Sequence, residues 1–427
     1  MLLKQISSVS AVTLAGLIMT TVLGVFLARL MGPSAYGEYA WVVSLCTLVA
    51  LPILGGLPSL IVREVSAKRV AMDQAGINGV VIFGHRVVFF GYIVIFVTLG
   101  SVASYTSLFD FDTAILGLAL LHILFMGYEA FYSSVLRGFS LVSLAIMPKN
   151  LLRPCILIVS LIVCDFFGVD FSSKMVLMLN AGVLLFVVLC MRLMYLYRVH
   201  PHLQSNTFNL ESRGWLLSLL PLTLYGAMSI ANGQVVVVIL GFFDETETVG
   251  LYRVAISIAG LVGVSLSIVN MVLAPRFSAN FQKNDYQQIN SDIRLGGGAA
   301  LLGCCFVTVL FFAWGKWGIS VVFGEEYNGV FALLVVLLFG ELINVASGSP
   351  ALLLNMSGNE VSTAKIMILA IVVTLALTVF LVPSFGGLGA AYAYSTSLIF
   401  WNIALGVVVY RKIGIISSPI LNWLASK

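Results

Sequence analysis

Apolar runs of about twenty residues recur along the whole 427-residue chain, separated by short polar breaks. The hydrocarbon core of a bilayer is about 30 Å thick, and an α-helix needs roughly 20 apolar residues to cross it. Reading the chain for such runs predicts twelve transmembrane helices. The predicted spans are 9–31, 40–62, 80–104, 113–136, 141–164, 174–197, 215–241, 250–273, 295–314, 329–350, 361–382 and 387–410.

The composition excludes a water-soluble fold of this size. Hydrophobic residues make up 60% of the chain and charged residues 9%, whereas soluble domains carry roughly 45–50% and about 25%. The first apolar run, from Val9 to Leu30, is longer than the roughly 7–15 apolar residues of a signal peptide, so we expect an uncleaved helix. The sequence therefore predicts an all-α integral membrane protein in a lipid bilayer.

The positive charges alternate with the predicted spans. In the twelve-span topology, four of the 22 lysines and arginines fall on one side of the membrane. The other 18 fall on the side that holds both chain ends, Lys4 and Lys427. The four are Arg29, Lys174, Arg253 and Lys316. Their side also carries the acidic residues Asp110, Asp112, Asp165, Asp170, Asp244, Glu245 and Glu247. Because cytoplasmic loops are rich in Lys and Arg, both termini are predicted to be cytoplasmic.

A weak internal repeat divides the chain into two halves. The polar segment around His200, Pro201 and His202 separates a lobe of six helices, residues 1–200, from a second at 215–427, with 201–214 as a cytoplasmic linker. Tyr36-Gly37-Glu38-Tyr39 and Val249-Gly250-Leu251-Tyr252 occupy matching places 213 residues apart. Repeated six-helix halves predict a substrate path at their interface.

Four short motifs carry a resemblance to a known family. They are Leu27-Ala28-Arg29-Leu30-Met31-Gly32-Pro33 with Tyr36-Gly37, Leu273-Ala274-Pro275-Arg276-Phe277-Ser278, Val322-Phe323-Gly324-Glu325-Glu326-Tyr327 and the segment from Val382 to Ala391. Their order and spacing resemble the polysaccharide flippases of the multidrug/oligosaccharidyl-lipid/polysaccharide exporter superfamily. Gly-Pro in the first motif and Gly-Gly in the last predict breaks between successive helices.

The resemblance implies a transporter, not an enzyme, with two six-helix lobes around a cavity that opens alternately to each side of a bacterial inner membrane. Its implied substrate is an undecaprenyl-diphosphate-linked repeat unit for O-antigen, capsule or another glycan. A polysaccharide polymerase and a chain-length regulator are the implied protein partners, and no nucleic acid is expected. The alternatives are a drug or cation antiporter of the same superfamily and a membrane polymerase or ligase.

Five cations within or at the edge of predicted spans are candidates for binding the diphosphate, because Arg and Lys suit phosphate. They are Lys149, Arg153, Arg29, Arg253 and Arg86. Lys149 and Arg153 stand four residues apart, which predicts one helical face, although either also suits an interface anchor. Arg29 and Arg253 alternatively pair with Glu38 or Glu247.

Glu129, Glu341 and His122 are candidates for coupling to a proton or sodium ion, since ionisable groups within spans are costly and usually functional. The alternative for Glu129 is an ion pair with Lys149 or Arg153. His122 precedes Glu129 by seven residues and shares its predicted face, where packing alone also accounts for it. The six cysteines lack metal-site spacing, so no metal or other cofactor is expected.

Overall fold

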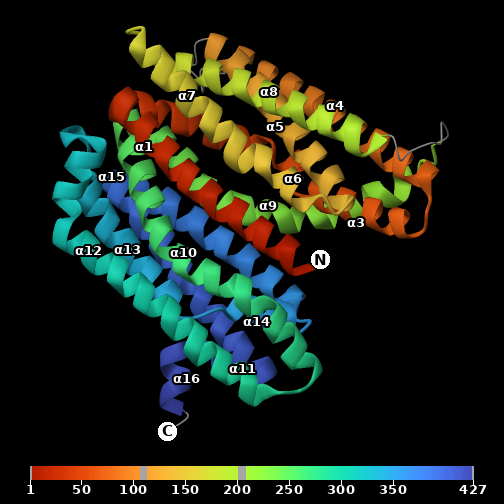
Figure 1. Cartoon of the computed structure of the whole chain (residues 1–427). Coiled ribbons are helices and arrows are strands. Elements are labelled where there is room, and N and C mark those ends of the chain that lie inside the picture. Colours follow the sequence, from red (N-terminus) through yellow and green to blue (C-terminus); the bar gives the residue numbers. More distant parts are fainter. Residues whose placement is uncertain (1, 106–112, 201–207, 426–427) are drawn as a thin grey trace. The chain divides into compact units, whose positions relative to one another are not determined.

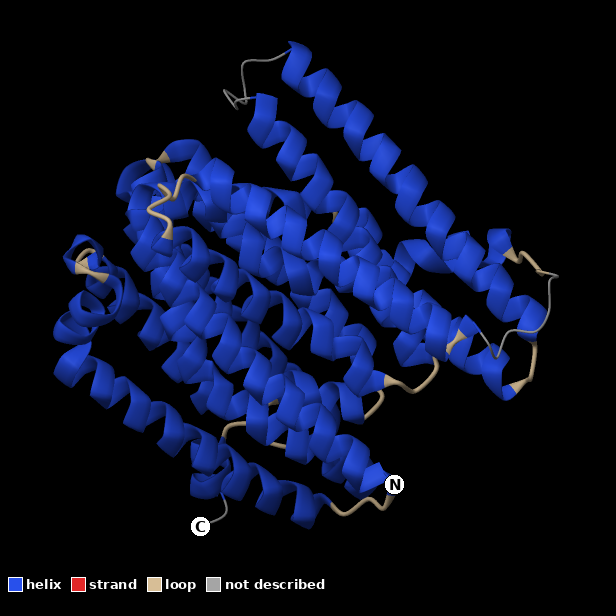
Figure 2. Ribbon diagram, turned by 45° about the horizontal axis from the view of Figure 1, so that its top comes forward, coloured by secondary structure: helices blue, strands red, loops and turns tan. Residues whose placement is uncertain are grey.

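The computed structural model describes residues 2–105, 113–200 and 208–425, and this part of the chain is α-helical with no β-strand (Figure 2). The predictions made for Asp110, Asp112, Pro201, His202 and Lys427 lie outside the described residues. Within the described ranges, nine helices are long and apolar enough to cross a membrane. Of these, α15 (Glu360–Ile413) holds two of the predicted spans, and α1 (Leu2–Val49) holds the first span and the beginning of the second.

Both long helices are broken at a glycine. Gly32 in α1 has φ 71° and ψ 169°, and Gly386 in α15 has φ 52° and ψ −131°. A side chain at such a positive φ clashes with the backbone, so glycine is the residue that fits there. At 1.5 Å per residue, a straight helix of either length far exceeds the bilayer core. The breaks confirm the prediction from the Gly-Pro and Gly-Gly motifs and separate the first span from the second and the eleventh from the twelfth.

The chain divides into two compact units. Unit 1 comprises Met1–Met31 and Trp41–Gln234. Its central helix α5 contacts α3, α4, α6 and α8 (Figure 1), and it buries Ile123, Phe131, Val135 and Leu136 in the core. The elements of unit 1 after the first helix are α2 (Leu51–Leu54), α3 (Leu57–Val70), α4 (Gln74–Tyr105), α5 (Thr113–Gly138), α6 (Val142–Met147), the π-turn η1 (Pro148–Leu152), α7 (Arg153–Phe166), α8 (Ser173–Arg198) and the first part of α9 (Ser212–Phe243).

Unit 2 comprises Gly32–Ala40 and Val235–Lys427. Helix α13 is central here, because it contacts α10, α12 and α15. The elements of unit 2 after α9 are α10 (Thr246–Gln282), α11 (Tyr286–Asp292), the π-turn η3 (Ile293–Gly297), α12 (Gly298–Phe323), the 3-10 turn η4 (Glu325–Tyr327), α13 (Val330–Ala346), α14 (Pro350–Met356), α15 and α16 (Pro419–Ala425).

Several predicted boundaries are wrong, because hydropathy indicates which residues lie in the bilayer and not where a helix begins and ends. The predicted inner loops 63–76 and 274–294 are largely helical, since α3 runs to Val70 and α10 runs to Gln282. The predicted span 40–62 is not one helix, because the chain breaks at Gly55-Gly56 between α2 and α3. Polar residues continue a helix beyond the membrane when its backbone hydrogen bonds remain satisfied.

The two repeat motifs meet inside unit 2. A Cβ placed on Gly250 would overlap the carbonyl oxygen of Pro33, and one on Gly37 would overlap the carbonyl oxygen of Thr246. The hydroxyls of Ser34 and Thr246 are 3.0 Å apart. Small residues thus allow the two backbones to cross closely, as is common between membrane helices.

Candidate functional site

A buried ion pair joins three helices of unit 1. Glu129 on α5 is 3% exposed, and its Oε2 lies 3.6 Å from Nη1 of Arg153 at the start of α7. The Nη2 of Arg153 donates to Oδ1 of Asn180 on α8 at 3.1 Å. Of the two cations considered for Glu129 from the sequence, the structure therefore selects Arg153. Asn180 was not foreseen, because a lone Asn within an apolar run carries no signal of its partner.

His122 lies two turns before Glu129 on α5 and is fully buried. Neither nitrogen of its imidazole ring has a hydrogen-bond partner among the described residues, and the same is true of Glu129 Oε1. Buried polar atoms without partners are uncommon in folded proteins and mark positions with a special role. We refer to Glu129, Arg153, Asn180 and His122 as the α5 charge group.

A π-turn lies at Pro148–Leu152, between two cations whose exposure differs. The backbone N–H of Arg153 bonds to the carbonyl oxygen of Pro148, five residues back, which is the π-helical pattern. Such a turn changes the angle between Lys149 and Arg153, which an α-helix would place on one face. Lys149 is exposed, whereas the Arg153 side chain is 19% exposed. Lys149 therefore lies outside the buried ion pair, and its pairing with Arg153 as a cationic site stays a prediction.

The second buried carboxyl group lies in unit 2 and is held by amides. Oε2 of Glu341 on α13 accepts a hydrogen bond of 3.0 Å from Nδ2 of Asn344. Oδ1 of Asn344 in turn accepts one of 3.0 Å from Nδ2 of Asn402 on α15. A Cβ on Gly263 of α10 would lie 3.0 Å from Glu341 Oε2, so the carboxyl group rests against bare backbone. We refer to Glu341, Asn344 and Asn402 as the α13 amide group.

The remaining predicted cations lie elsewhere. Arg29 and Arg86 have exposed side chains in unit 1, outside the α5 charge group. Arg253 in unit 2 is half-buried and hydrogen-bonds the side chain of Tyr36, close to the crossing of the repeat motifs. The structure therefore does not gather the five candidate cations into one cluster within either unit.

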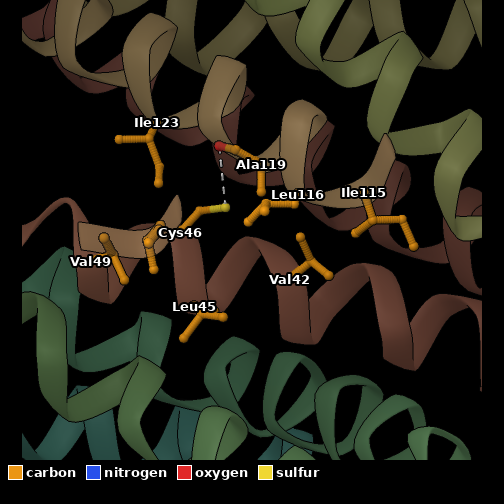
Figure 3. A pocket seen from close by; sticks show the side chains of 9 residues that line it. Val42, Leu45, Cys46, Val49, Ile115, Leu116, Ala119 and Ile123 are labelled. Carbon is orange, nitrogen blue, oxygen red and sulfur yellow. Dashed lines mark hydrogen bonds between the residues drawn. The ribbon is translucent and has the colours of Figure 1, made fainter. Parts of the chain in front are cut away.

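A small cavity in unit 1 lies between α1 and α5 (Figure 3). Its volume is about 30 Å³, and its lining includes Val42, Val49, Ile115 and Ile123. The thiol of Cys46 donates to the carbonyl oxygen of Ala119 at 3.6 Å beside it. An apolar space of this size lacks the polar partners that a water molecule or a sugar needs. This cavity is therefore a packing gap and not a candidate for substrate binding.

No group of three or more His, Cys, Asp or Glu side chains that could hold a metal ion occurs in the ranges that the structure describes. The buried ionisable side chains Glu129 and Glu341 and the largely buried Arg153 are instead each engaged with one or two polar partners. The candidate site is thus a set of charges inside membrane helices, divided between the α5 charge group and the α13 amide group.

Comparisons with known proteins agree with a membrane fold of this kind. Residues 2–281 match the family described as "Polysaccharide biosynthesis protein". A relative from Haloferax volcanii, the "Probable low-salt glycan biosynthesis flippase Agl15", is 30% identical over 167 residues, which is 38% of this chain and 34% of the relative. The match thus spans about a third of that relative's length.

Two solved structures show the same fold. The lipid II flippase MurJ in an inward closed conformation superposes with a TM-score of 0.75 at 15% identity, covering 97% of this chain and 89% of MurJ. An inward-facing multidrug resistance MATE family transporter of the MOP superfamily superposes with a TM-score of 0.71 at 14% identity, covering 93% of this chain and 94% of the transporter. The fold is therefore the one predicted from the sequence, with about twelve transmembrane helices in two six-helix lobes.

Proposed function

Because this chain belongs to the polysaccharide biosynthesis protein family, we propose that it moves a lipid-linked oligosaccharide across a membrane by alternating access. The observation that carries the proposal is the family match in a chain with nine helices, among the described residues, that are long and apolar enough to span a bilayer. The partial relative from Haloferax volcanii, named as a probable glycan flippase, supports the same substrate class.

The finer form of the proposal comes from the sequence. The substrate is an undecaprenyl-diphosphate-linked repeat unit of an O-antigen, capsule or similar glycan, in a bacterial inner membrane with both termini in the cytoplasm. The alternation of positive charge along the chain supports this orientation. The lobes are residues 1–200 and 215–427, and a polymerase and a chain-length regulator are the protein partners.

The exposed cations are the ones we assign to the diphosphate. Lys149, Arg29 and Arg86 are exposed in unit 1, and Arg253 in unit 2 has a neutral phenol as its hydrogen-bond partner. The charge of Arg153 is offset by the carboxylate of Glu129. We therefore assign Arg153 to holding α5, α7 and α8 together, with phosphate contact as a further role when Glu129 is displaced.

The proposal is tested with the full chain in proteoliposomes that contain a fluorescent polyprenyl-diphosphate-linked oligosaccharide. The fraction of label that a membrane-impermeant reagent can reach reports movement between leaflets. We expect the protein to raise the rate of movement between leaflets at least tenfold over that in empty liposomes. The double variant K149Q with R29Q should lose most of that increase. A rate equal to that of empty liposomes would overturn the proposal.

The α13 amide group favours a second candidate function, a cation antiporter. The described residues place no cationic side chain in an ion pair with Glu341, and a buried carboxylate without a cation is suited to bind one from solution. Efflux of an organic cation from the same proteoliposomes, driven by a proton or sodium gradient, distinguishes the two functions. Gradient-driven efflux without movement of the glycolipid would favour the antiporter.

A further inference from the structure

Five aromatic rings from three helices of unit 1 form one cluster. The imidazole ring of His85 on α4 lies 4.4 Å from Phe131 and 5.7 Å from Tyr132 on α5, between ring centroids. Tyr128 stacks on Tyr132 at 6.3 Å and 28°, and Tyr132 lies 6.0 Å from Tyr195 on α8. Because α5 contacts both α4 and α8 (Figure 1), the cluster links the same ends of three neighbouring helices.

An arginine stands beside these rings on α8. Arg192 precedes Tyr195 by three residues, so the two lie on one face of that helix. The guanidinium is in an exposed side chain. In the part of the chain that the structure describes, it forms no ion pair with a carboxylate and no cation–π contact. Its fork of five N–H donors is therefore available to a ligand.

The depth of the cluster suits a lipid headgroup. His85, Tyr132 and Arg192 stand four or five residues from the predicted cytoplasmic ends of their spans, which is roughly 6–8 Å along a helix. Large apolar side chains are exposed farther along the same helices, including Phe89 on α4 and Leu189 on α8. A lipid whose tail lies along these apolar faces brings its headgroup to the level of the rings and the guanidinium.

We propose that Arg192, His85, Tyr128 and Tyr195, packed around the buried ring of Tyr132, form a binding site for the phosphate-bearing, glycosylated headgroup of a lipid in the predicted cytoplasmic leaflet. The choice of lipid class rests on the proposed function. The guanidinium and the phenol hydroxyls supply donors to phosphate, and a planar fork binds it with two parallel hydrogen bonds.

The rings favour a glycolipid over an ordinary phospholipid. An arginine alone binds the phosphate of any anionic lipid at an interface, so a phospholipid makes no use of the partly exposed rings of His85, Tyr128 and Tyr195. The C–H faces of a sugar pack on aromatic rings, which offer a large, stiff apolar surface beside polar hydroxyls. The same cluster thus offers one group for the phosphate and a surface for the first sugar.

The test uses the full-length protein in phosphatidylcholine nanodiscs and measures lipid binding by native mass spectrometry. The probes are a polyprenyl diphosphate with and without an attached sugar, phosphatidylglycerol and inorganic pyrophosphate. We expect R192Q to weaken both diphosphate lipids about tenfold or more, which corresponds to about 1.4 kcal/mol. We expect Y128L to weaken the glycosylated lipid at least threefold and to leave the sugar-free lipid within twofold of the wild type.

Arg198 supplies the matched control, because it is an exposed arginine in the last turn of the same helix. R198Q is expected to bind every probe as the wild type does. Equal losses for R192Q and R198Q would identify Arg192 as an ordinary interface anchor and overturn the site. The glycolipid assignment would also be overturned if R192Q weakened phosphatidylglycerol as much as it weakens the diphosphate lipids. The same holds if inorganic pyrophosphate bound the wild type as tightly as the lipids do.

Two further measurements separate this inference from the proposed function. R192K keeps the positive charge but loses the planar guanidinium. An intermediate affinity for the diphosphate lipids therefore supports phosphate recognition by Arg192, whereas wild-type affinity contradicts it. If the protein fails to move a glycolipid in proteoliposomes but binds it through Arg192, the site stands and the flippase proposal fails. If transport occurs and R192Q binds normally, the flippase proposal stands and the site fails.

Discussion

The two buried carboxyl groups of this chain have opposite surroundings. Glu129 in unit 1 is 3% exposed and faces the guanidinium of Arg153, while Glu341 in unit 2 is 6% exposed and accepts a hydrogen bond from the amide of Asn344. The amide of Asn344 is held in turn by Asn402. One group therefore contains a fixed pair of opposite charges, and the other surrounds a carboxyl group with neutral dipoles.

This difference separates two roles for an acidic residue within a membrane. Burying an ion is costly, and a partner of opposite charge offsets that cost only while both partners remain. The α5 charge group is thus neutral as a whole and gains little from binding another ion. The α13 amide group keeps its carboxyl group without a counter-charge, so gain and loss of a proton or a cation change its energy directly. We therefore expect ion dependence to arise from Glu341 and not from Glu129.

Removing one charge of the pair has the largest expected effect. E129Q leaves Arg153 in a largely buried place without its counter-charge, and such changes cost about 3–5 kcal/mol. The melting temperature of the purified protein in detergent should fall clearly. The double variant E129Q with R153Q should regain most of the loss, because it removes both charges. If the single and double variants melt alike, the pair does not stabilise unit 1.

The second-largest expected effect on stability comes from removing Asn344, whose side-chain amide donates to Glu341. N344A deletes the donor to Glu341 Oε2 and the acceptor for Asn402, and an unsatisfied buried polar group costs about 1–3 kcal/mol. We expect a smaller fall in melting temperature than for E129Q. N355A on α14 is the control, because Asn355 Oδ1 is buried but has no hydrogen-bond partner among the described residues. A loss for N355A as large as that for N344A would contradict the role of the amide group.

Neutralising Glu341 should change transport more than stability. In E341Q the carboxamide keeps an oxygen that accepts from Asn344, so the expected loss of stability is about 1 kcal/mol or less. The dependence of flux on a proton or sodium gradient in proteoliposomes should disappear. E129Q with R153Q, measured in parallel, should retain that dependence. Gradient-dependent flux in E341Q would show that the coupling group lies elsewhere.

The sequence predicted the membrane fold well and the partners of the charges poorly. Apolar length determines where a helix crosses a bilayer, so the spans and the breaks at Gly32 and Gly386 could be predicted. The pairing of Glu129 could not, because both Lys149 and Arg153 lay within reach on an ideal α-helix. The structure pairs Glu129 with Arg153, next to a π-turn at Pro148–Leu152 whose extra residue no rule based on spacing anticipates.

The aromatic cluster was missed for a related reason. Arg192, His85 and Tyr132 lie on three helices, more than 100 residues apart at the extremes, and each alone is typical of a membrane interface. Their convergence depends on how α4 and α8 pack against α5, which a single sequence does not reveal. The glycines show the same limit, since Gly37 and Gly250 were recognised as a repeat but not as residues that touch.

The smallest expected effect on stability comes from an ion pair at the end of α3. It allows the buried pair of Glu129 and Arg153 to be compared with a pair that reaches the protein surface. Nζ of Lys68 lies 2.8 Å from Glu211 Oε1, and the Glu211 side chain is 52% exposed. Burial lowers the pKa of Lys68, but the hydrogen bond and charge of Glu211, with Asp73 and Glu64, outweigh it and raise the pKa. A pair in which one partner is exposed, as Glu211 is here, contributes about 0.2–1 kcal/mol, less than the pair of Glu129 and Arg153.

The direction of the pKa shift sets the pH range in which the Lys68 contribution disappears. Since the pKa of Lys68 is higher in the folded protein, its contribution is fully present below the unfolded value of about 10.4 and is lost as the pH rises through the folded value. The difference in melting temperature between wild type and E211Q should therefore narrow only as the pH rises above about 10.4 and should decrease in high salt. The fall in melting temperature caused by E129Q should change little with salt concentration, because buried charges are screened weakly. A salt-sensitive deficit of E129Q would place that pair in contact with water and remove the contrast between the two carboxyl groups.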